Sequence, residues 1–220
     1  SSNVLDQYVL AKLADTIESV TASMDVYDLF AACQTIRNFL DVLTNWYIRR
    51  SRDRFWAGNQ DAIDTLHTVL DYIVRIAAPL LPLVTDEVFQ GLHGAEAGSV
   101  HLTDWPSSSE LPRNPVLVTA MDMVRDVCSS ALSVRKAHGR RVRLPLASLT
   151  IAAANAASLD GFLDIVRDEV NVRDVVLTAD VDSVASHELQ VVPAIVGPRL
   201  GPRTQAVIVA VKKGEWTQDG

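Results

Sequence analysis

Apolar residues in the first half of the chain follow the spacing of consecutive amphipathic helices. In residues 5–23 they recur every three or four positions, at Leu5, Val9, Leu13, Ile17 and Val20, which predicts a helix with one buried face. A second stripe runs through residues 26–47, with Asp25 as its candidate N-cap. The first Gly after this stripe, Gly58, is expected to end the helix.

Two further helices are predicted before the pattern breaks. One covers residues 60–78, and Pro79 and Pro82 force a break before a short helix near residues 85–92. Four amphipathic segments with short connectors predict an antiparallel bundle. Residues 94–114 are rich in Gly, Ser and Pro, and we expect them to strap back over the bundle with Trp105 as an anchor.

The second half of the chain changes character after a fifth predicted helix at residues 116–137, which Gly139 stops. Strands are predicted at residues 144–154, 172–178 and 207–211, a helix at 159–169 and a turn-rich loop at 197–203. The predicted fold class is therefore mainly α. An antiparallel helix bundle with its strap forms residues 1–112, and a smaller α+β part forms residues 113–220.

Composition excludes several kinds of site. Only two cysteines occur, Cys33 and Cys128, and neither has a second Cys or a nearby His at the spacing of metal ligands. This predicts no disulfide framework, no metal site and a reducing compartment. The apolar runs are too short to span a bilayer, so no membrane partner is expected. The start at Ser1 without Met and the stop at Gly220 suggest a piece of a longer protein.

Positive charge is gathered in two segments of an acidic chain. The sequence has 20 Lys and Arg against 27 Asp and Glu, a net charge of −7. Residues 45–56 nevertheless contain four Arg and one Asp, and residues 135–143 contain five cations and no acid. Such a body repels a polyanion everywhere except at a chosen docking face, and binding there is sensitive to salt.

The first basic segment also carries aromatic residues. It reads Asn-Trp-Tyr-Ile-Arg-Arg-Ser-Arg-Asp-Arg-Phe-Trp, and Arg with Trp suits phosphates and splayed bases of RNA. At helical spacing, an outward stripe is predicted for Trp46, Arg49, Asp53 and Trp56. The alternative is a helix end with arginines in solvent and tryptophans in the core. Both remain open from the sequence.

Arg50 and Arg54 of this segment are predicted to face the packed side. A buried guanidinium is costly without a partner, so each is expected to pair with a carboxylate such as Asp86, Glu87 or Asp41. The second basic segment has two interpretations as well. Its cations can stabilise the end of a helix through the dipole, or form a phosphate-contacting loop, which we favour because like charges repel without a polyanion.

Motifs of a self-contained catalytic centre are absent from the sequence. It has no Gly-rich phosphate loop, no His-Glu-x-x-His and no Gly-x-Ser-x-Gly, and its five histidines are scattered. We therefore expect no catalytic residue in this chain.

Three motifs resemble the anticodon-binding region of isoleucyl-tRNA synthetases, which are class I enzymes. They are residues 45–56, Pro79-Leu80-Leu81-Pro82 followed by Thr85-Asp86-Glu87, and residues 100–106, Val-His-Leu-Thr-Asp-Trp-Pro. Valyl, leucyl and methionyl enzymes share these motifs in looser form. Residues 135–146 and 171–175 look like the start of the isoleucyl C-terminal extension.

The resemblance implies a full-length ligase that joins isoleucine to its tRNA with ATP and Mg²⁺ in the cytoplasm. The His-Ile-Gly-His and Lys-Met-Ser-Lys-Ser signatures are missing here, so this chain is expected to hold no cofactor and to be non-catalytic. Implied partners are tRNA(Ile) and the catalytic and editing domains of the same protein.

The residues predicted to contact tRNA come from both basic segments. Those expected to touch the anticodon arm are Trp46, Arg49, Arg52 and Trp56, and those expected to contact phosphates are Arg140, Arg141 and Arg143. Two alternatives remain. The chain could be a helical protein-interaction scaffold that docks a partner through exposed Trp side chains, or the equivalent region of a valyl, leucyl or methionyl enzyme.

Overall fold

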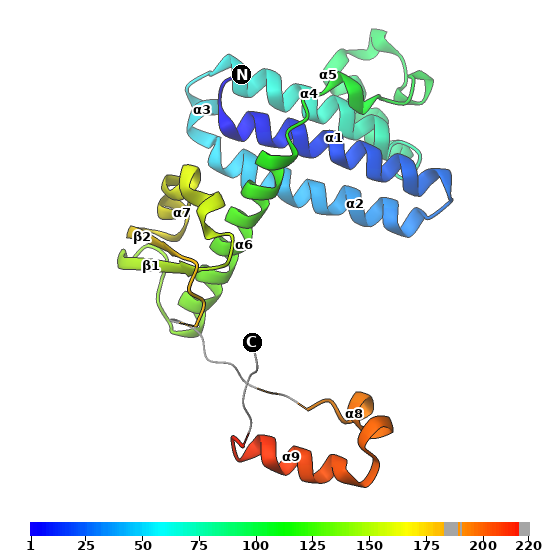
Figure 1. Ribbon diagram of the computed structural model, residues 1–220. Coiled ribbons are helices and arrows are strands. Elements are labelled where there is room, and N and C mark those ends of the chain that lie inside the picture. Colours follow the sequence, from blue (N-terminus) through cyan, green and yellow to red (C-terminus); the bar gives the residue numbers. More distant parts are fainter. Residues whose placement is uncertain (183–188, 190, 216–220) are drawn as a thin grey trace.

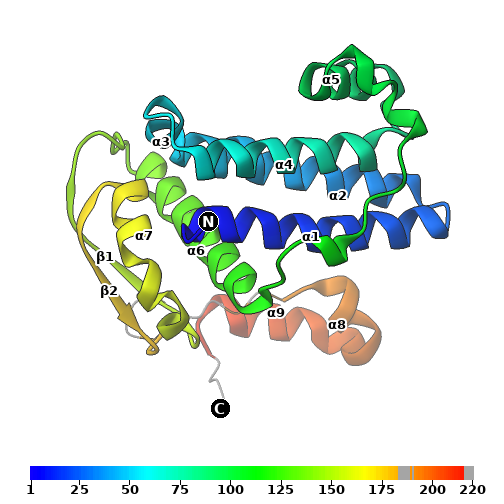
Figure 2. The same ribbon diagram turned by 90° about the horizontal axis from the view of Figure 1, so that it is seen from above.

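Three long helices lie side by side in the computed structural model, which describes residues 1–182, 189 and 191–215. They are α1 (Val4–Asp25), α2 (Leu29–Asp41) and α4 (Gln60–Ala77), and successive ones run in opposite directions (Figures 1 and 2). Helix α6 (Pro115–Ala137) crosses the layer formed by these three helices. A small α/β unit packs against α6 at one end of the layer. The mainly α fold class with a smaller α+β part is confirmed.

The turn between α1 and α2 differs from the expectation in its cap. Asp28, not Asp25, accepts a hydrogen bond from the backbone N–H of Ala31 and starts α2. Asp25 is the last residue of α1. A carboxylate at position 25 or 28 could cap the next helix. The backbone of Tyr27 is left-handed, with φ of 60°, and this turn places Asp28 at the N-cap of α2.

Helix α2 does not run to Gly58 as a regular α-helix. It passes into a π-helical segment, Val42–Ile48, and after a break at Ser51 a short helix α3 (Arg52–Trp56) follows. Gly58 then takes a positive φ of 66°, as expected for the residue that ends this stretch. The basic residues 45–56 therefore begin in the π-helical segment and end in α3, with a break at Ser51, and do not form one regular helix.

The predicted strap is present and is anchored as expected. Helix α5 (Pro82–His93) starts at Pro82, because proline is well suited to the first turn of a helix. Asp86 accepts hydrogen bonds from the Ser99 hydroxyl and the Val100 N–H, which fold the strap back on α5. Farther along, the indole N–H of Trp105 donates to the Thr21 hydroxyl on α1 at 2.9 Å.

The α/β unit is a β–α–β arrangement. Strands β1 (Leu146–Ala152) and β2 (Val172–Thr178) pair in parallel, with Leu146 opposite Val172, and α7 (Leu163–Val170) connects them after a 3₁₀ stretch (Ala156–Phe162). Asn171 ends α7 in the left-handed conformation and leads directly into β2. The predictions for residues 144–154, 159–169 and 172–178 are confirmed in type.

Two predictions for the last part of the chain are wrong. Residues 197–203 are not a loop, since α8 (Pro193–Leu200) and a 3₁₀ turn (Gly201–Arg203) cover them. Residues 207–211 lie in helix α9 (Thr204–Lys212) and not in a strand. A short Val-rich run is ambiguous between the two structures, and a strand forms only where a neighbouring strand pairs with it.

Polar contacts join α6 to the bundle around Asp122. Its carboxylate accepts hydrogen bonds from the Tyr8 hydroxyl at 2.7 Å and from Lys12 Nζ at 2.5 Å, both on α1. Arg125 of α6 reaches Asp41 of α2 at 3.2 Å. The domain division between residues 112 and 113 stays a prediction. Within the described part of the chain, no helix has the length and apolar character needed to cross a membrane.

Candidate nucleic-acid interface

Glu169 of α7 neutralises part of the first basic segment. Its two carboxylate oxygens pair with Arg49 Nη2 at 2.5 Å and with Arg50 Nη1 at 2.9 Å. The Glu169 side chain is 8% exposed, whereas that of Arg49 is 46% exposed. One carboxylate shared by two guanidinium groups leaves a surplus positive charge, and Arg49 presents it to solvent.

Trp46 is buried, so the prediction that it faces outward is wrong. Its side chain is 4% exposed, and the Arg50 guanidinium lies 5.3 Å from the centre of its ring. Buried positions along α2 and the π-helical segment include Phe39, Leu43 and Trp46, whereas Leu40, which falls within the apolar stripe predicted for residues 26–47, is exposed. A small cavity between α2, α6 and α7 is lined by Trp46, Cys128 and Glu169 among others, which shows that α6 and α7 cover the face expected to meet solvent.

Arg54 is paired as expected, but with a carboxylate that the sequence analysis did not consider. Both of its terminal nitrogens reach Asp6 of α1 at 2.6 Å. Asp6 is fully buried and also accepts hydrogen bonds from the Tyr47 hydroxyl and the Ser1 hydroxyl. The expected partners for Arg50 and Arg54 are wrong, because Glu169 and Asp6 take these places. Asp6 lies on the apolar stripe of α1, and a carboxylate there is the signal that could have identified it.

The pKa of the Asp6 carboxyl reflects this pairing. Burial acts to raise the pKa, but the hydrogen bonds from Arg54, Ser1 and Tyr47 and the charge of Arg54 outweigh burial and lower it. The pair fixes α3 against the first turn of α1. It therefore sets the position of the residues on α3 that remain exposed.

We expect the contribution of Asp6 to stability to disappear in acid. Because its pKa is lower in the folded state, the unfolded chain binds the proton more readily, so this contribution is present above the unfolded pKa of about 3.9 and is lost as the pH falls through the folded pKa. Urea unfolding of the wild type and Asp6→Asn from pH 7 to pH 2 measures it. The difference in unfolding free energy should be largest at pH 7 and shrink below about pH 4.

Asp25→Asn, which neutralises an exposed carboxylate at the end of α1, is the matched control and should follow the wild type at each pH. A difference between wild type and Asp6→Asn that stays constant over the whole range would contradict the assignment.

Arg52, Asp53 and Trp56 are the exposed residues of α3. The Trp56 side chain is 84% exposed, as the outward stripe predicted. Arg52 is exposed, and within the described residues no carboxylate pairs with it. Residues four apart on a helix share a face, so Arg52 and Trp56 lie on one exposed face of α3.

The second basic segment forms the loop between α6 and β1. Arg140, Arg141 and Arg143 are exposed, and in the part of the chain that the structure describes no acidic side chain pairs with them. With Gly139 and Leu144 they line a shallow hollow. Arg135, counted with them in the sequence, instead turns inward from α6 and is 3% exposed.

Helix α7 connects the two basic segments. Glu169 binds Arg49 and Arg50, and the carbonyl of the next residue, Val170, accepts a hydrogen bond from Arg135. Helix α3 and the β1–α7–β2 unit lie at the same end of the bundle, away from the turn between α1 and α2, in both views (Figures 1 and 2). The exposed cations are therefore placed on one end of the molecule, on either side of α7.

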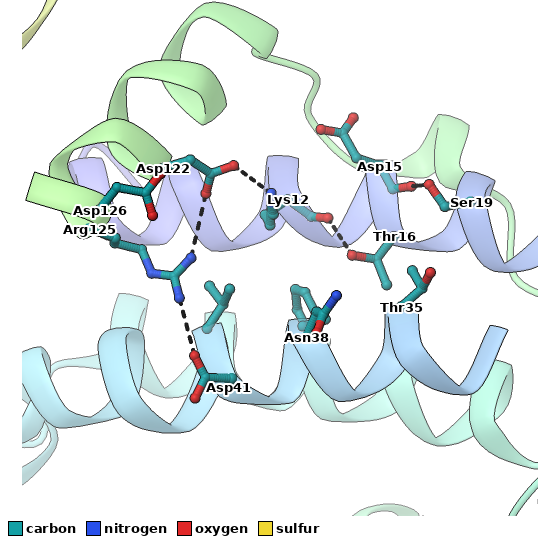
Figure 3. A pocket seen from close by; sticks show the side chains of 12 residues that line it. Lys12, Asp15, Thr16, Ser19, Thr35, Asn38, Asp41, Asp122, Arg125 and Asp126 are labelled. Atoms are coloured by element: carbon teal, nitrogen blue, oxygen red, sulfur yellow. Dashed lines mark hydrogen bonds and ion pairs between the residues drawn. The ribbon is translucent and has the colours of Figure 1, made fainter. Parts of the chain in front are cut away.

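A groove elsewhere on the bundle has the opposite charge. It lies between α1, α2 and α6, and Figure 3 shows Lys12 and Arg125 surrounded by the carboxylates of Asp15, Asp41, Asp122 and Asp126. The two cations are engaged with Asp122 and Asp41. Because carboxylates outnumber cations there, this groove repels a polyanion.

Comparison with known proteins decides the family. The model of the family described as the anticodon-binding domain of tRNA ligase matches residues 6–151. The chain belongs to this family. The match begins in the first turn of α1 and ends within β1. The first basic segment and the loop of residues 139–144, here called the arginine loop, therefore both lie inside the anticodon-binding domain. The family resemblance seen in the sequence is confirmed.

Relatives of this anticodon-binding domain carry a more specific name. The chain is 55% identical over 218 residues to an isoleucine–tRNA ligase of Nocardia farcinica, and 53% identical over 215 residues to one of Mycobacterium tuberculosis. A third, from Corynebacterium efficiens, is 52% identical over 223 residues. These alignments cover 98% to 100% of this chain but only 20% to 21% of the relatives. The chain thus spans about one fifth of the length of the curated relatives it matches.

Proposed function

We propose that this chain holds the anticodon arm of tRNA(Ile) as part of an isoleucine–tRNA ligase. The observation that carries the proposal is the exposed pair on α3 in a chain of the anticodon-binding family: Trp56 is 84% exposed, and Arg52 has no carboxylate partner among the described residues. A flat indole offers a stacking face for an unpaired base, and the adjacent guanidinium binds phosphate. High identity to isoleucine–tRNA ligases supports the choice of tRNA.

The remaining contacts follow from the exposure of each side chain. Arg49 adds the charge that Glu169 does not neutralise, and Arg140, Arg141 and Arg143 contact phosphates from the loop after α6. Trp46 is left out of the proposed contact surface because α6 and α7 cover it, and its ring instead supports the Arg50 guanidinium. In the full-length ligase, the other domains would bind ATP and Mg²⁺ and catalyse aminoacylation in the cytoplasm.

Titration of the chain with tRNA(Ile) at 50 mM and 200 mM salt tests the proposal. Phosphate contacts require affinity to fall steeply with salt. Trp56→Ala should weaken binding by about tenfold, since a stacked base is worth about 1–3 kcal/mol, and should leave the melting temperature unchanged because the side chain is exposed.

Phe30→Ala is the matched control, since Phe30 is 81% exposed at the start of α2, at the other end of the bundle. It should leave tRNA affinity unchanged. Equal losses for both variants, or affinity that does not depend on salt, would favour the protein-interaction scaffold over the RNA-binding domain.

A further inference from the structure

Arg135 is a buried cation without an acidic partner. It lies in the last turn of α6 with 3% of its surface exposed, and in the described part of the chain no carboxylate pairs with it. A buried guanidinium is costly unless its donors are used. Its position therefore requires another group to take up its hydrogen bonds.

Backbone carbonyls accept the hydrogen bonds of its two terminal nitrogens, whereas its Nε has no partner among the described residues. Nη1 donates to the Val170 carbonyl at 3.1 Å, at the end of α7. Nη2 lies within hydrogen-bonding distance of three carbonyls of the arginine loop, those of Arg141 at 2.6 Å, Val142 at 3.2 Å and Leu144 at 2.5 Å. A single side chain thus ties the loop to both α6 and α7.

Asn171 holds the same loop by a further hydrogen bond. The contacts of Arg135 and Asn171 with the loop carbonyls are called the two clamps below. Its side-chain amide donates to the Val142 carbonyl at 2.8 Å, so that carbonyl is held by both residues. Asn171 occupies the left-handed region with φ of 53°, a conformation that Asn tolerates better than most residues. The α7–β2 junction and the end of α6 therefore fix the loop from two sides.

The two clamps engage carbonyl groups of the loop, so its backbone N–H groups and exposed guanidinium groups remain as hydrogen-bond donors for an anion. The carbonyls of Arg141, Val142 and Leu144 are bound to Arg135, while the backbone N–H groups of residues 141–143 have no acceptor among the described residues. The guanidinium groups of Arg140, Arg141 and Arg143 are exposed around the hollow. Uncommitted N–H groups next to cationic side chains form a site suited to phosphate.

We propose that Arg135 is a positioning residue that preforms the loop of residues 139–144 as a phosphate-binding site for tRNA. The inference rests on the proposed function and adds a residue that does not itself touch RNA. A loop with several cations and no clamp would sample many conformations and lose entropy on binding. Fixing its backbone in advance removes part of that cost.

The test compares four variants of the chain by tRNA(Ile) affinity at two salt concentrations and by amide hydrogen exchange. Arg135→Met keeps all three exposed arginines but removes the clamp. It should speed exchange in residues 141–144 and weaken tRNA binding by about tenfold. Arg135→Lys should behave like Arg135→Met, because one ammonium group cannot bridge carbonyls on both sides as the planar fork does.

Asn171→Gly keeps the left-handed backbone and removes only the second clamp, so it serves even where Arg135→Met fails to fold. It should weaken tRNA binding in the same direction, by about threefold. Arg37→Met removes one exposed charge from α2 and controls for net charge; it should match the wild type.

The inference would be overturned if amide hydrogen exchange in the loop were unchanged in both Arg135→Met and Asn171→Gly. Wild-type tRNA affinity in Arg135→Lys would overturn it as well. Faster exchange with unchanged tRNA affinity would overturn it too, because the loop would then not carry the contact. Failure of the proposed function looks different, since the wild type itself would then bind no tRNA at either salt concentration.

Discussion

Replacement of Arg54 by alanine is expected to lower the free energy of unfolding by about 3 kcal/mol. Among the described residues, the substitution leaves the fully buried Asp6 carboxylate with the Tyr47 and Ser1 hydroxyls as its hydrogen-bond partners. Removing one member of a buried ion pair is costly because the other charge stays buried without compensation. Urea denaturation at pH 7, followed by circular dichroism, measures the change.

A double-mutant cycle separates this effect from loss of packing. In an Asp6→Asn background the side chain at this position carries no charge. Arg54→Ala should therefore lower the free energy of unfolding much less in that background than in the wild type. Equal decreases in the free energy of unfolding in the two backgrounds would show that the coupling free energy between Asp6 and Arg54 is zero. The same variant should also weaken tRNA binding, since the Arg54 pair holds α3 and thus Arg52 and Trp56 in place.

The second large effect is expected for the triple variant Arg140→Ala, Arg141→Ala and Arg143→Ala. Each phosphate contact contributes about 0.7 to 0.9 to the slope of log affinity against log salt, so loss of three should lower the slope by about 2 to 3. At 0.1 M salt, affinity for tRNA(Ile) should fall by about 100-fold. Thermal stability should be unchanged, because these side chains are exposed without acidic partners among the described residues.

A triple variant of matched charge controls for long-range attraction. Arg37, Arg199 and Arg203 are exposed outside the proposed interface, and replacing all three with alanine changes the net charge by the same amount. This control should keep most of the affinity and the salt slope. A similar loss in both triple variants would mean that net charge, and not the loop, governs binding.

The helices of the bundle were predictable because their signals are local. Apolar spacing located α1, α4 and α6, and proline and glycine marked several of the ends, as at Pro82 and Gly58. In the α/β unit, β1 was predicted from a short apolar run, α7 from helical spacing and β2 from a Val-rich run, whereas the parallel pairing of the two strands was not predicted. A Val-rich run misled at residues 207–211, where no strand of the described residues pairs with the segment and a helix satisfies its backbone internally.

The candidate interface was predictable only in outline. Sequence located the two basic segments and the exposed Trp56, since charge and aromatic content are local properties. It placed Trp46 in solvent, because periodicity separates the faces of one helix but does not reveal that α6 and α7 cover a second face. Arg50 and Arg54 needed carboxylates by the same local reasoning, yet distance along the chain hid which ones.

The amino-acid sequence by itself determined the helical bundle, the family and the two cationic segments of an acidic chain, because each depends on composition and spacing between near neighbours. Tertiary structure alone decided which cations are exposed without an acidic partner among the described residues. Glu169 lies 120 residues from Arg49 and Asp6 lies 48 residues from Arg54, and only folding brings these charges within bonding distance. Arg135 is the converse case: packing against α7 turned a cation of the basic segment into an internal support for the three that stay exposed.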